Sequence, residues 1–445
     1  MTPDQVTAMS GNAAWMLISA ALVLLMTPAL AFFYGGMSGQ RSVLNMMMMS
    51  FGSLGVVSVI YVLWGWSMSY GNEDIGTIFA NPFEQFGLAG AITDADGNYL
   101  AGAAGYANVI DIGFQLTFAV IATALITGAI ANRVKFSTWM VFSALWVTFS
   151  YFPLAHMVWG GGLLSHGENS LSAWLFGTIT EDGETVAAIA PIDFAGGTVV
   201  HINAGIAALV LALVVGHSHG FMKQAHRPHN LPMVMLGAAL LWFGWFGFNA
   251  GSAFAADGLA GLAWLNTTVA TAAAMLGWLA TERIRDGKAT SLGAASGVVA
   301  GLVAITPAAG DLSPVSSIAL GAIGGALACL GVGLKYRFRF DDSLDVVGVH
   351  LVAGLWGTVG AGLLANDTGL LLGGGADGVR LVVIQILIAL VALVFSGVVT
   401  LIIALALKAT MGWRISEEDE FGGIDGAEHG ETAYETSTPI PNPMR

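Results

Sequence analysis

Long apolar runs constrain this chain more than any other feature. Eleven of them follow one another, at about residues 12–36, 45–70, 111–131, 137–157, 194–216, 231–252, 260–281, 291–309, 314–334, 346–365 and 380–408. About 20 apolar residues suffice for an α-helix to cross a bilayer, and a helix satisfies its own backbone hydrogen bonds there. Only 10% of residues are charged and 60 are glycine, which favours close helix packing. The sequence predicts an all-α polytopic membrane protein with eleven transmembrane helices.

The basic residues predict an orientation. Of the 15 lysines and arginines, only Arg380 lies in a loop on the opposite side from the rest. The positive-inside rule places the basic loops and the C-terminus in the cytoplasm and the N-terminus outside, which requires an odd number of spans. Asp4 stands before the first run where a signal peptide would carry basic residues, so residues 7–36 are expected to form a retained span.

Two histidines lie inside apolar runs in matching local sequence, V-H-I-N-A-G around His201 and V-H-L-V-A-G around His350. Each has an aspartate eight residues upstream, Asp193 and Asp342. An ionisable side chain is costly in a bilayer, so each histidine marks a candidate functional site. The duplication in the fifth and tenth spans indicates an inverted repeat with a site at its interface, as in many transporters.

This repeat divides the chain into four parts. We expect a first five-helix repeat at 1–216, a second, inverted five-helix repeat at 217–365, an eleventh helix within 366–414 and a cytoplasmic tail at 415–445. Five helices per repeat force the two halves into opposite orientations. The tail is acidic and polar, a composition also typical of disorder.

The histidine pair suits proton or solute transfer. A neutral imidazole offers one donor and one acceptor, so paired rings satisfy each other and can relay a proton or bind a small polar solute. The alternative is a structural hydrogen bond between helices. A metal site would need a third ligand, and the lone Cys329 supplies neither a disulfide nor a thiol motif.

Aromatic residues gather where the predicted spans meet the outer face: Phe114, Phe118, Trp159, Trp245 and Phe248. Aromatic faces stabilise cations, tryptophan best, and Ser252 lies four residues after Phe248 to accept a hydrogen bond. The alternative is an interfacial aromatic belt. Asp193 and Asp342 are expected to cap the helices that carry the histidines.

Several motifs together resemble the ammonium transporter (Amt/Mep/Rh) family. They are AHMVWGGG (155–162), DFAGGTVVHINAG (193–205), PHNLP (228–232), GWFGFNAGS (244–252), DVVGVH (345–350) and HGETAY (429–434). Trp159 and Ser252 match the Amt branch rather than the Rh branch. The acidic segment 167–192 is longer than the link expected in the family, which bears on the outer vestibule.

The resemblance implies a homotrimer in the cell membrane, among membrane lipids, with one pore in each subunit. The residues that match the family's functional positions are Trp159, Phe118, Phe114 and Ser252 for an outer ammonium site, Phe118 and Phe248 for a gate, His201 and His350 for the pore, Phe33 and Trp245 for pore lining, and Asp193 for a required acid. It also implies a tail ordered over 415–436 and a PII-type signalling protein at the cytoplasmic mouth. No cofactor, metal or nucleic acid is expected.

The physical chemistry of ammonium suggests a mechanism. Ammonium and potassium have similar size and charge, but ammonium donates hydrogen bonds and can lose a proton. Alkylammonium groups have pKa values near 10.4, which desolvation lowers by up to about 3–5 units. An apolar gate therefore favours ammonia over potassium, and methylammonium is a possible second substrate. The resemblance favours net charge movement.

Two other functions are weighed against transport. An ammonium sensor would signal through the tail, although sensors usually carry an appended output domain and only residues 415–445 follow the last span. An intramembrane metal-dependent hydrolase would need ligands and an activating acid beyond the two histidines. Transport fits the sequence best.

Overall fold

The computed structural model describes residues 3–223 and 227–434 and is an elongated bundle of helices. The described part contains eleven helices long and apolar enough to cross a membrane, which confirms the predicted number. They are Thr7–Met37, Val43–Tyr70, Asn108–Ile130, Phe136–Trp159, Gly197–Val215, Leu231–Ala250, Gly258–Asp286, Ser291–Ala308, Pro314–Phe338, Val347–Leu364 and Gly375–Thr410. These match the predicted spans in order and closely in bounds.

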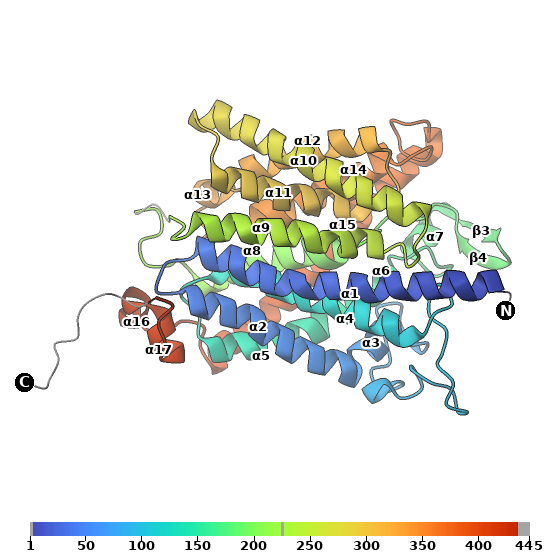
Figure 1. The fold of residues 1–445 in the computed structure, drawn as a ribbon, viewed down its shortest axis with the longest axis horizontal. Helices are drawn as coiled ribbons and strands as arrows, with labels where there is room; N and C mark the ends of the chain where they lie inside the picture. The colour runs from blue at the N-terminus through green and yellow to red at the C-terminus, as the bar shows by residue number, and fades with distance from the viewer. Residues whose placement is uncertain (1–2, 224–226, 435–445) are drawn as a thin grey trace, which may run out of the picture.

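The spans run along the long axis of the molecule in Figure 1. Their main helices are α1 (Pro3–Met37), α2 (Val43–Ile60), α3 (Trp66–Tyr70), α4 (Asn108–Leu125), α5 (Phe136–Trp146), α6 (Phe152–Trp159), α8 (Asn203–Val215), α9 (Leu231–Trp245), α10 (Gly258–Asp286), α11 (Ser291–Ile305), α12 (Pro314–Gly331), α13 (Leu334–Phe338), α14 (Ala353–Leu364) and α15 (Gly375–Thr410). α1 begins at one end of the bundle, and the tail helices lie at the other.

Polar side chains set where several spans begin. Asn230, Asp257, Thr290 and Ser313 each accept a hydrogen bond from the backbone N–H three residues later, at the starts of α9, α10, α11 and α12. Such caps satisfy N–H groups that have no partner inside the helix.

π-helical turns interrupt five of the spans, at Tyr61–Gly65, Val147–Tyr151, Gly197–Ile202, Phe246–Ala250 and Val347–Val352. Two of these turns contain His201 and His350. π-turns shift the side chains that follow them and occur often at functional sites. The sequence motifs around the histidines therefore coincide with equivalent local backbone distortions.

The loops after Asp193 and Asp342 make equivalent backbone contacts. The Phe194 N–H donates to the Pro307 carbonyl at 2.9 Å, at the end of the eighth span. The Leu344 N–H donates to the Gly128 carbonyl at 3.1 Å, at the end of the third. Each loop is thus tied to the third span of the opposite half in the proposed repeat. The two-half division and the orientation in the membrane stay predictions.

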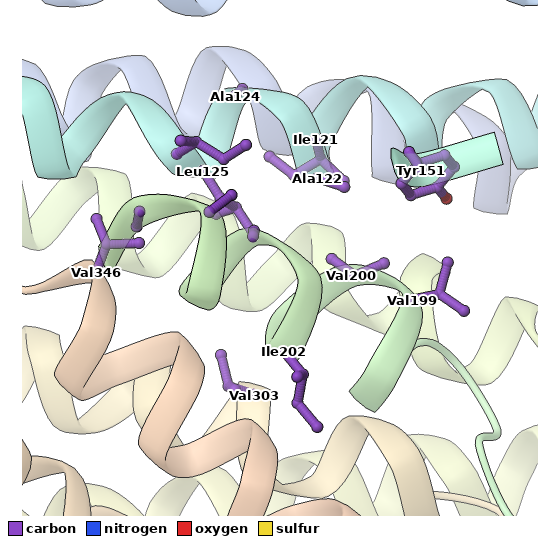
Figure 2. Close-up of a cluster of buried hydrophobic side chains, with 14 of the residues drawn as sticks. Ile121, Ala122, Ala124, Leu125, Tyr151, Val199, Val200, Ile202, Val303 and Val346 are labelled. Carbon is purple, nitrogen blue, oxygen red and sulfur yellow. The ribbon is translucent and has the colours of Figure 1, made fainter. Parts of the chain in front are cut away.

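Small and β-branched residues form the core around the histidine helices. Figure 2 shows Ile121 and Leu125 of α4 facing Val199 and Val200 of the fifth span, with Val346 nearby. All five are at most 2% exposed. Side chains packed this densely have little room to move, so the histidines are held in a rigid frame.

The segment 167–192 forms its own small structure at the same end of the bundle as the start of α1. It contains α7 (Leu171–Phe176) and an antiparallel hairpin of β3 (Thr178–Glu181) and β4 (Glu184–Ala187). A second short hairpin, β1 (Asp74–Ile75) with β2 (Phe79–Ala80), follows the second span.

The described part of the tail is ordered. α16 (Glu417–Gly422) and α17 (Ile424–His429) pack on the opposite end of the bundle. The Asp425 carboxylate accepts hydrogen bonds from Leu44 N at 3.1 Å and Asn45 N at 2.8 Å, so the tail caps α2. Glu428 accepts one from Phe136 N at 2.9 Å, at the start of α5. The predicted ordering holds to residue 434, while 435 and 436 lie outside the described residues.

Candidate functional site

A cavity of about 450 Å³ opens at the end of the bundle near α7, and we call it the vestibule. Residues that line it include Phe118, Trp159, Asp193, Ser252, Phe254 and Asp311. Three of the four predicted outer-site residues therefore lie together in one cavity. They come from α4, α6 and the end of the sixth span, far apart in sequence.

Trp159 ends α6 and is held at the edge of the vestibule. Its Nε1–H donates to the Asp193 carbonyl at 2.9 Å. Its ring lies 6.2 Å from that of Phe118 at 85°, an edge-on arrangement, and both rings line the vestibule. The Ser252 hydroxyl donates to the Phe248 carbonyl at 2.8 Å, which leaves its oxygen lone pairs to accept from a solute.

Phe114 is placed differently from the sequence-based expectation. Its ring is fully buried against Phe118, at a centroid distance of 4.8 Å, and does not line the vestibule. Phe254 lies edge-on to it at 5.8 Å and lines the cavity instead. Two apolar rings one helical turn apart cannot both face a cavity when a third aromatic covers the outer one. Phe114 therefore supports the site from behind.

Phe118 and Phe248 close the inner end of the vestibule. Their rings stack at a centroid distance of 4.1 Å and an angle of 19°, and both are at most 1% exposed. On the far side, Phe248 lies 6.2 Å from the ring of His201. The order along this path is vestibule, two stacked phenylalanines, then histidine.

The two histidine rings meet as the motifs predicted. Their Nδ1 atoms are 3.3 Å apart, and the ring planes differ by 22°. Since each neutral ring has one N–H, one Nδ1 donates and the other accepts. His201 Nε2 is buried and has no hydrogen-bond partner among the described residues. This ring nitrogen is therefore available to bind a solute, and its ring lies next to the gate residue Phe248.

Trp245 packs against the ring of His201. Its ring stacks on His201 at 5.5 Å and 14°, and its Nε1–H donates to Thr306 Oγ1 at 2.9 Å. With 2% exposure it lies deep beside the histidines rather than at the outer face. It fixes the His201 ring plane.

The glycines of the two histidine motifs explain why the rings can meet. A Cβ on Gly205 would lie 2.6 Å from the Leu351 backbone nitrogen, and one on Gly354 would lie 3.1 Å from His201 Cβ. Each motif's glycine thus makes room for the helix that carries the other motif, the close approach that small residues permit in membranes.

Beyond His350 the path narrows. A void of about 10 Å³ there is lined by residues that include Phe33, Tyr34, Val349 and His350. This is near the least volume that holds one water molecule. The structure places Phe33 beside His350, where the resemblance implied a pore-lining residue.

The two aspartates cap the histidine helices. Asp193 Oδ1 accepts from Gly196 N at 2.8 Å and Gly197 N at 2.6 Å, and Oδ2 accepts from Thr198 N at 2.9 Å and from the Thr198 hydroxyl. Burial raises the pKa of this carboxyl above its usual value, although the same hydrogen bonds from Thr198 and the two glycines act to lower it. Both oxygens are occupied, so Asp193 acts on a solute through its charge.

Asp342 repeats the arrangement at the other end. Its oxygens accept from Val346 N at 3.0 Å and Val347 N at 2.7 Å, and it is 2% exposed. Burial raises its pKa to about 7, against the lowering effect of Lys335. The expected register of both caps is confirmed.

Sequence reasoning missed several vestibule residues, among them Gln115, Phe254 and Asp311. Gln115 is a polar residue inside an apolar run, which is a usable signal. Asp311 lies in a loop, and no local pattern tells which cavity a loop carboxylate faces. Among the described residues, no three His, Cys, Asp or Glu side chains gather as metal ligands.

Comparison with known proteins decides the family. The model of the Ammonium Transporter Family matches residues 14–434. The chain belongs to this family. It is 51% identical to an ammonium transporter of Mycobacterium tuberculosis, with 96% of this chain and 90% of the relative covered. It is 45% identical to one of Aquifex aeolicus, with 96% and 93% covered.

Solved structures of the family share the fold. A structure described as a sensor Amt protein superposes with a TM-score of 0.81 at 27% identity, covering 95% of this chain and 99% of that one. Mep2 of Saccharomyces cerevisiae gives 0.78 at 29% identity, with 98% and 94% covered. This family member is therefore a multi-pass membrane protein of a transporter family.

Proposed function

We propose that this protein transports ammonium through a pore that runs from the vestibule, past Phe118 and Phe248, to the paired histidines. The observation that carries the proposal is a series of neighbouring groups: an aromatic and acidic cavity, a buried gate of two stacked phenyl rings, and two hydrogen-bonded imidazoles. Relatives named ammonium transporters support the substrate.

Recruitment takes place at Trp159 and Ser252. The tryptophan face attracts a cation, and the serine oxygen accepts one of its N–H groups. Asp193 adds negative charge close by without giving up its backbone hydrogen bonds. No lysine or arginine lines this cavity in the described part of the chain, so a cation meets no repulsion there.

The gate separates ammonium from potassium. Two stacked phenyl rings offer no ligand to replace the water around an ion, and desolvation of an unpaired charge is costly. Ammonium escapes this cost by losing its proton, and ammonia then passes between rings that open only slightly. Potassium has no neutral form.

The histidines carry the proton and the ammonia onward. The free Nε2 of His201 accepts a hydrogen bond or a proton from the gate side, and the 3.3 Å Nδ1 contact passes it to His350. Net charge therefore moves with each ammonium. Phe33 and the small void beyond His350 lead ammonia out.

The remaining features belong to the same proposal. Residues 1–216 and 217–365 are inverted repeats, supported by the equivalent caps, π-turns and loop contacts of Asp193 and Asp342. The vestibule faces outward, supported by the basic loops on the opposite side. The protein works as a homotrimer in the cell membrane, and a PII-type protein binds at its cytoplasmic face.

Purified protein in liposomes on a solid-supported membrane tests transport. Pulses of ammonium chloride are expected to give a transient current, and equal pulses of potassium chloride none. Ammonia equilibration without current would replace charge movement by neutral conduction. Equal currents for the two ions would overturn the proposed gate.

A second function, ammonium sensing, is favoured by the ordered tail and by the likeness to a sensor Amt protein. Because α17 caps α2, a change in the spans can reach the tail directly. Sensing predicts that ammonium alters protease cleavage of the tail even where the gate is blocked, and that liposomes give neither current nor ammonia flux.

A further inference from the structure

Two hydrogen-bond acceptors of the vestibule have no partner among the residues that the structure describes. The Asp311 carboxylate receives no hydrogen bond from any described residue, although its backbone is well held. Gln115 Oε1 is buried and likewise has no partner in the described part of the chain. A buried acceptor without a donor is costly, so Gln115 Oε1 points to a ligand that donates hydrogen bonds, and the half-buried Asp311 carboxylate offers free lone pairs in the same cavity.

Asp311 sits on a rigid turn between the eighth and ninth spans. Its N–H donates to the Ala308 carbonyl at 3.1 Å, and its carbonyl accepts from Asn366 N at 2.9 Å. The preceding Gly310 packs so closely on Phe194 that an added Cβ would lie 2.3 Å from the ring. The carboxylate is therefore positioned by three segments of chain rather than by a free loop.

The contrast with Asp193 separates two roles. Both carboxylates line the vestibule, but every oxygen of Asp193 is engaged by the helix that it caps. Asp311 alone of the two offers free lone pairs to a solute. A cation that donates hydrogen bonds, such as ammonium, suits either acceptor.

We propose that Asp311 is a further substrate-binding residue of the vestibule, whose free carboxylate holds ammonium by charge and hydrogen bond before the gate. The inference rests on the proposed function and adds a second acid to the recruitment site. Gln115 Oε1 provides a neutral acceptor in the same cavity.

Cation binding at Asp311 is expected to depend on pH. The titratable groups of the vestibule and of the segments packed on the Asp311 turn are Asp193, Tyr70, His166 and Asp367, with no lysine or arginine among the described lining residues. Burial raises the pKa of Asp311 to about 6. The carboxyl is therefore mostly ionised at pH 7.5 and mostly protonated at pH 5, and binding weakens as the pH falls.

Transport kinetics test the role with matched variants. At pH 7.5, D311N is expected to raise the ammonium concentration for half-maximal current about three- to tenfold. D311E keeps the charge and the wild-type value, and E181Q removes an exposed acid of β3 without effect. From pH 7.5 to 5 the wild-type value rises toward that of D311N, which stays flat. Equal values and equal pH dependence in wild type and D311N would overturn the proposal.

Infrared difference spectra make the outcome independent of transport. A carboxyl band that titrates near pH 6 is expected in wild type and absent in D311N. Ammonium chloride shifts its midpoint to lower pH, while sodium chloride at equal concentration does not. A band unmoved by ammonium would reject Asp311 as a ligand. A shift without any current would retain Asp311 and reject the transport mechanism.

Discussion

The two sides of the histidine pair have similar backbone structures but open into cavities of different volume. On each side an aspartate caps a π-helical turn that carries a histidine, and the following loop bonds to a distant span. Yet the Asp193 side opens into about 450 Å³ with acids and aromatic rings directly before the gate, while the void that His350 lines on the Asp342 side measures about 10 Å³.

This difference separates recognition from passage. A hydrated cation needs room and acceptors to exchange its water, and the vestibule offers both next to the gate. The narrow side admits a solute the size of water and is lined by His350, Ser296 and mostly apolar side chains. The shared frame holds the histidines in place, while the loops and side chains at each end make the path asymmetric.

The sharpest test of this comparison removes each cap in turn. D193A and D342A are each expected to lower the free energy of unfolding by about 1–3 kcal/mol, because capped N–H groups lose their acceptor. Only D193A is expected to abolish the saturable ammonium current, because the Asp193 side chain holds the turn whose backbone carbonyl accepts the hydrogen bond from Trp159. Thermal unfolding in detergent and liposome currents measure the two effects. Equal loss of transport in D193A and D342A would contradict the proposed functional difference between the two sides.

Loss of the histidine pair comes next in size. The double variant H201L/H350L is expected to reduce the ammonium current about tenfold or more, since proton transfer by positioned groups contributes at least about 10²-fold in enzymes. H217Q, an exposed histidine bonded to the Arg339 carbonyl, is the control. An undiminished, ammonium-selective current would exclude the histidines from the proton path.

Removal of the aromatic face in the vestibule has a smaller effect. W159L is expected to raise the half-maximal ammonium concentration about 5- to 30-fold, from a cation–π energy of about 1–2 kcal/mol. W174L, on the exposed face of α7, is the matched control. If both variants behave alike, the aromatic residues form only an interfacial belt.

The smallest effect is expected at Ser252. S252A removes one acceptor and should raise the same concentration about two- to tenfold, for a hydrogen bond worth about 0.5–1.5 kcal/mol. T268A serves as the control, because its hydroxyl also donates to a carbonyl four residues earlier but lies outside the vestibule. An unchanged value in S252A would show that the hydroxyl oxygen does not contact ammonium.

Much of the fold was predictable because spans and caps are local. Apolar runs located all eleven helices, and the spacing of Asp193 and Asp342 from the histidines located both caps. Span ends were less predictable: α10 continues to Asp286, past the apolar run, because helix formation does not stop where hydropathy does.

Long-range packing hid the rest of the site. That Phe254 covers Phe114, and that Asp311 faces the same cavity as Trp159, depends on contacts between distant spans. The π-turns also leave no local signature. Sequence motifs indicated candidate site residues, and only the packed structure shows which of them share a cavity.

Simultaneous recording of current and internal pH in liposomes tests the central claim, that a proton follows ammonia along His201 and His350. An ammonium pulse is expected to drive current without alkalinising the lumen, because one proton enters with each ammonia. In H201L/H350L the current should fall, and any remaining flux should alkalinise the lumen. Alkalinisation without current in the wild type would contradict the account.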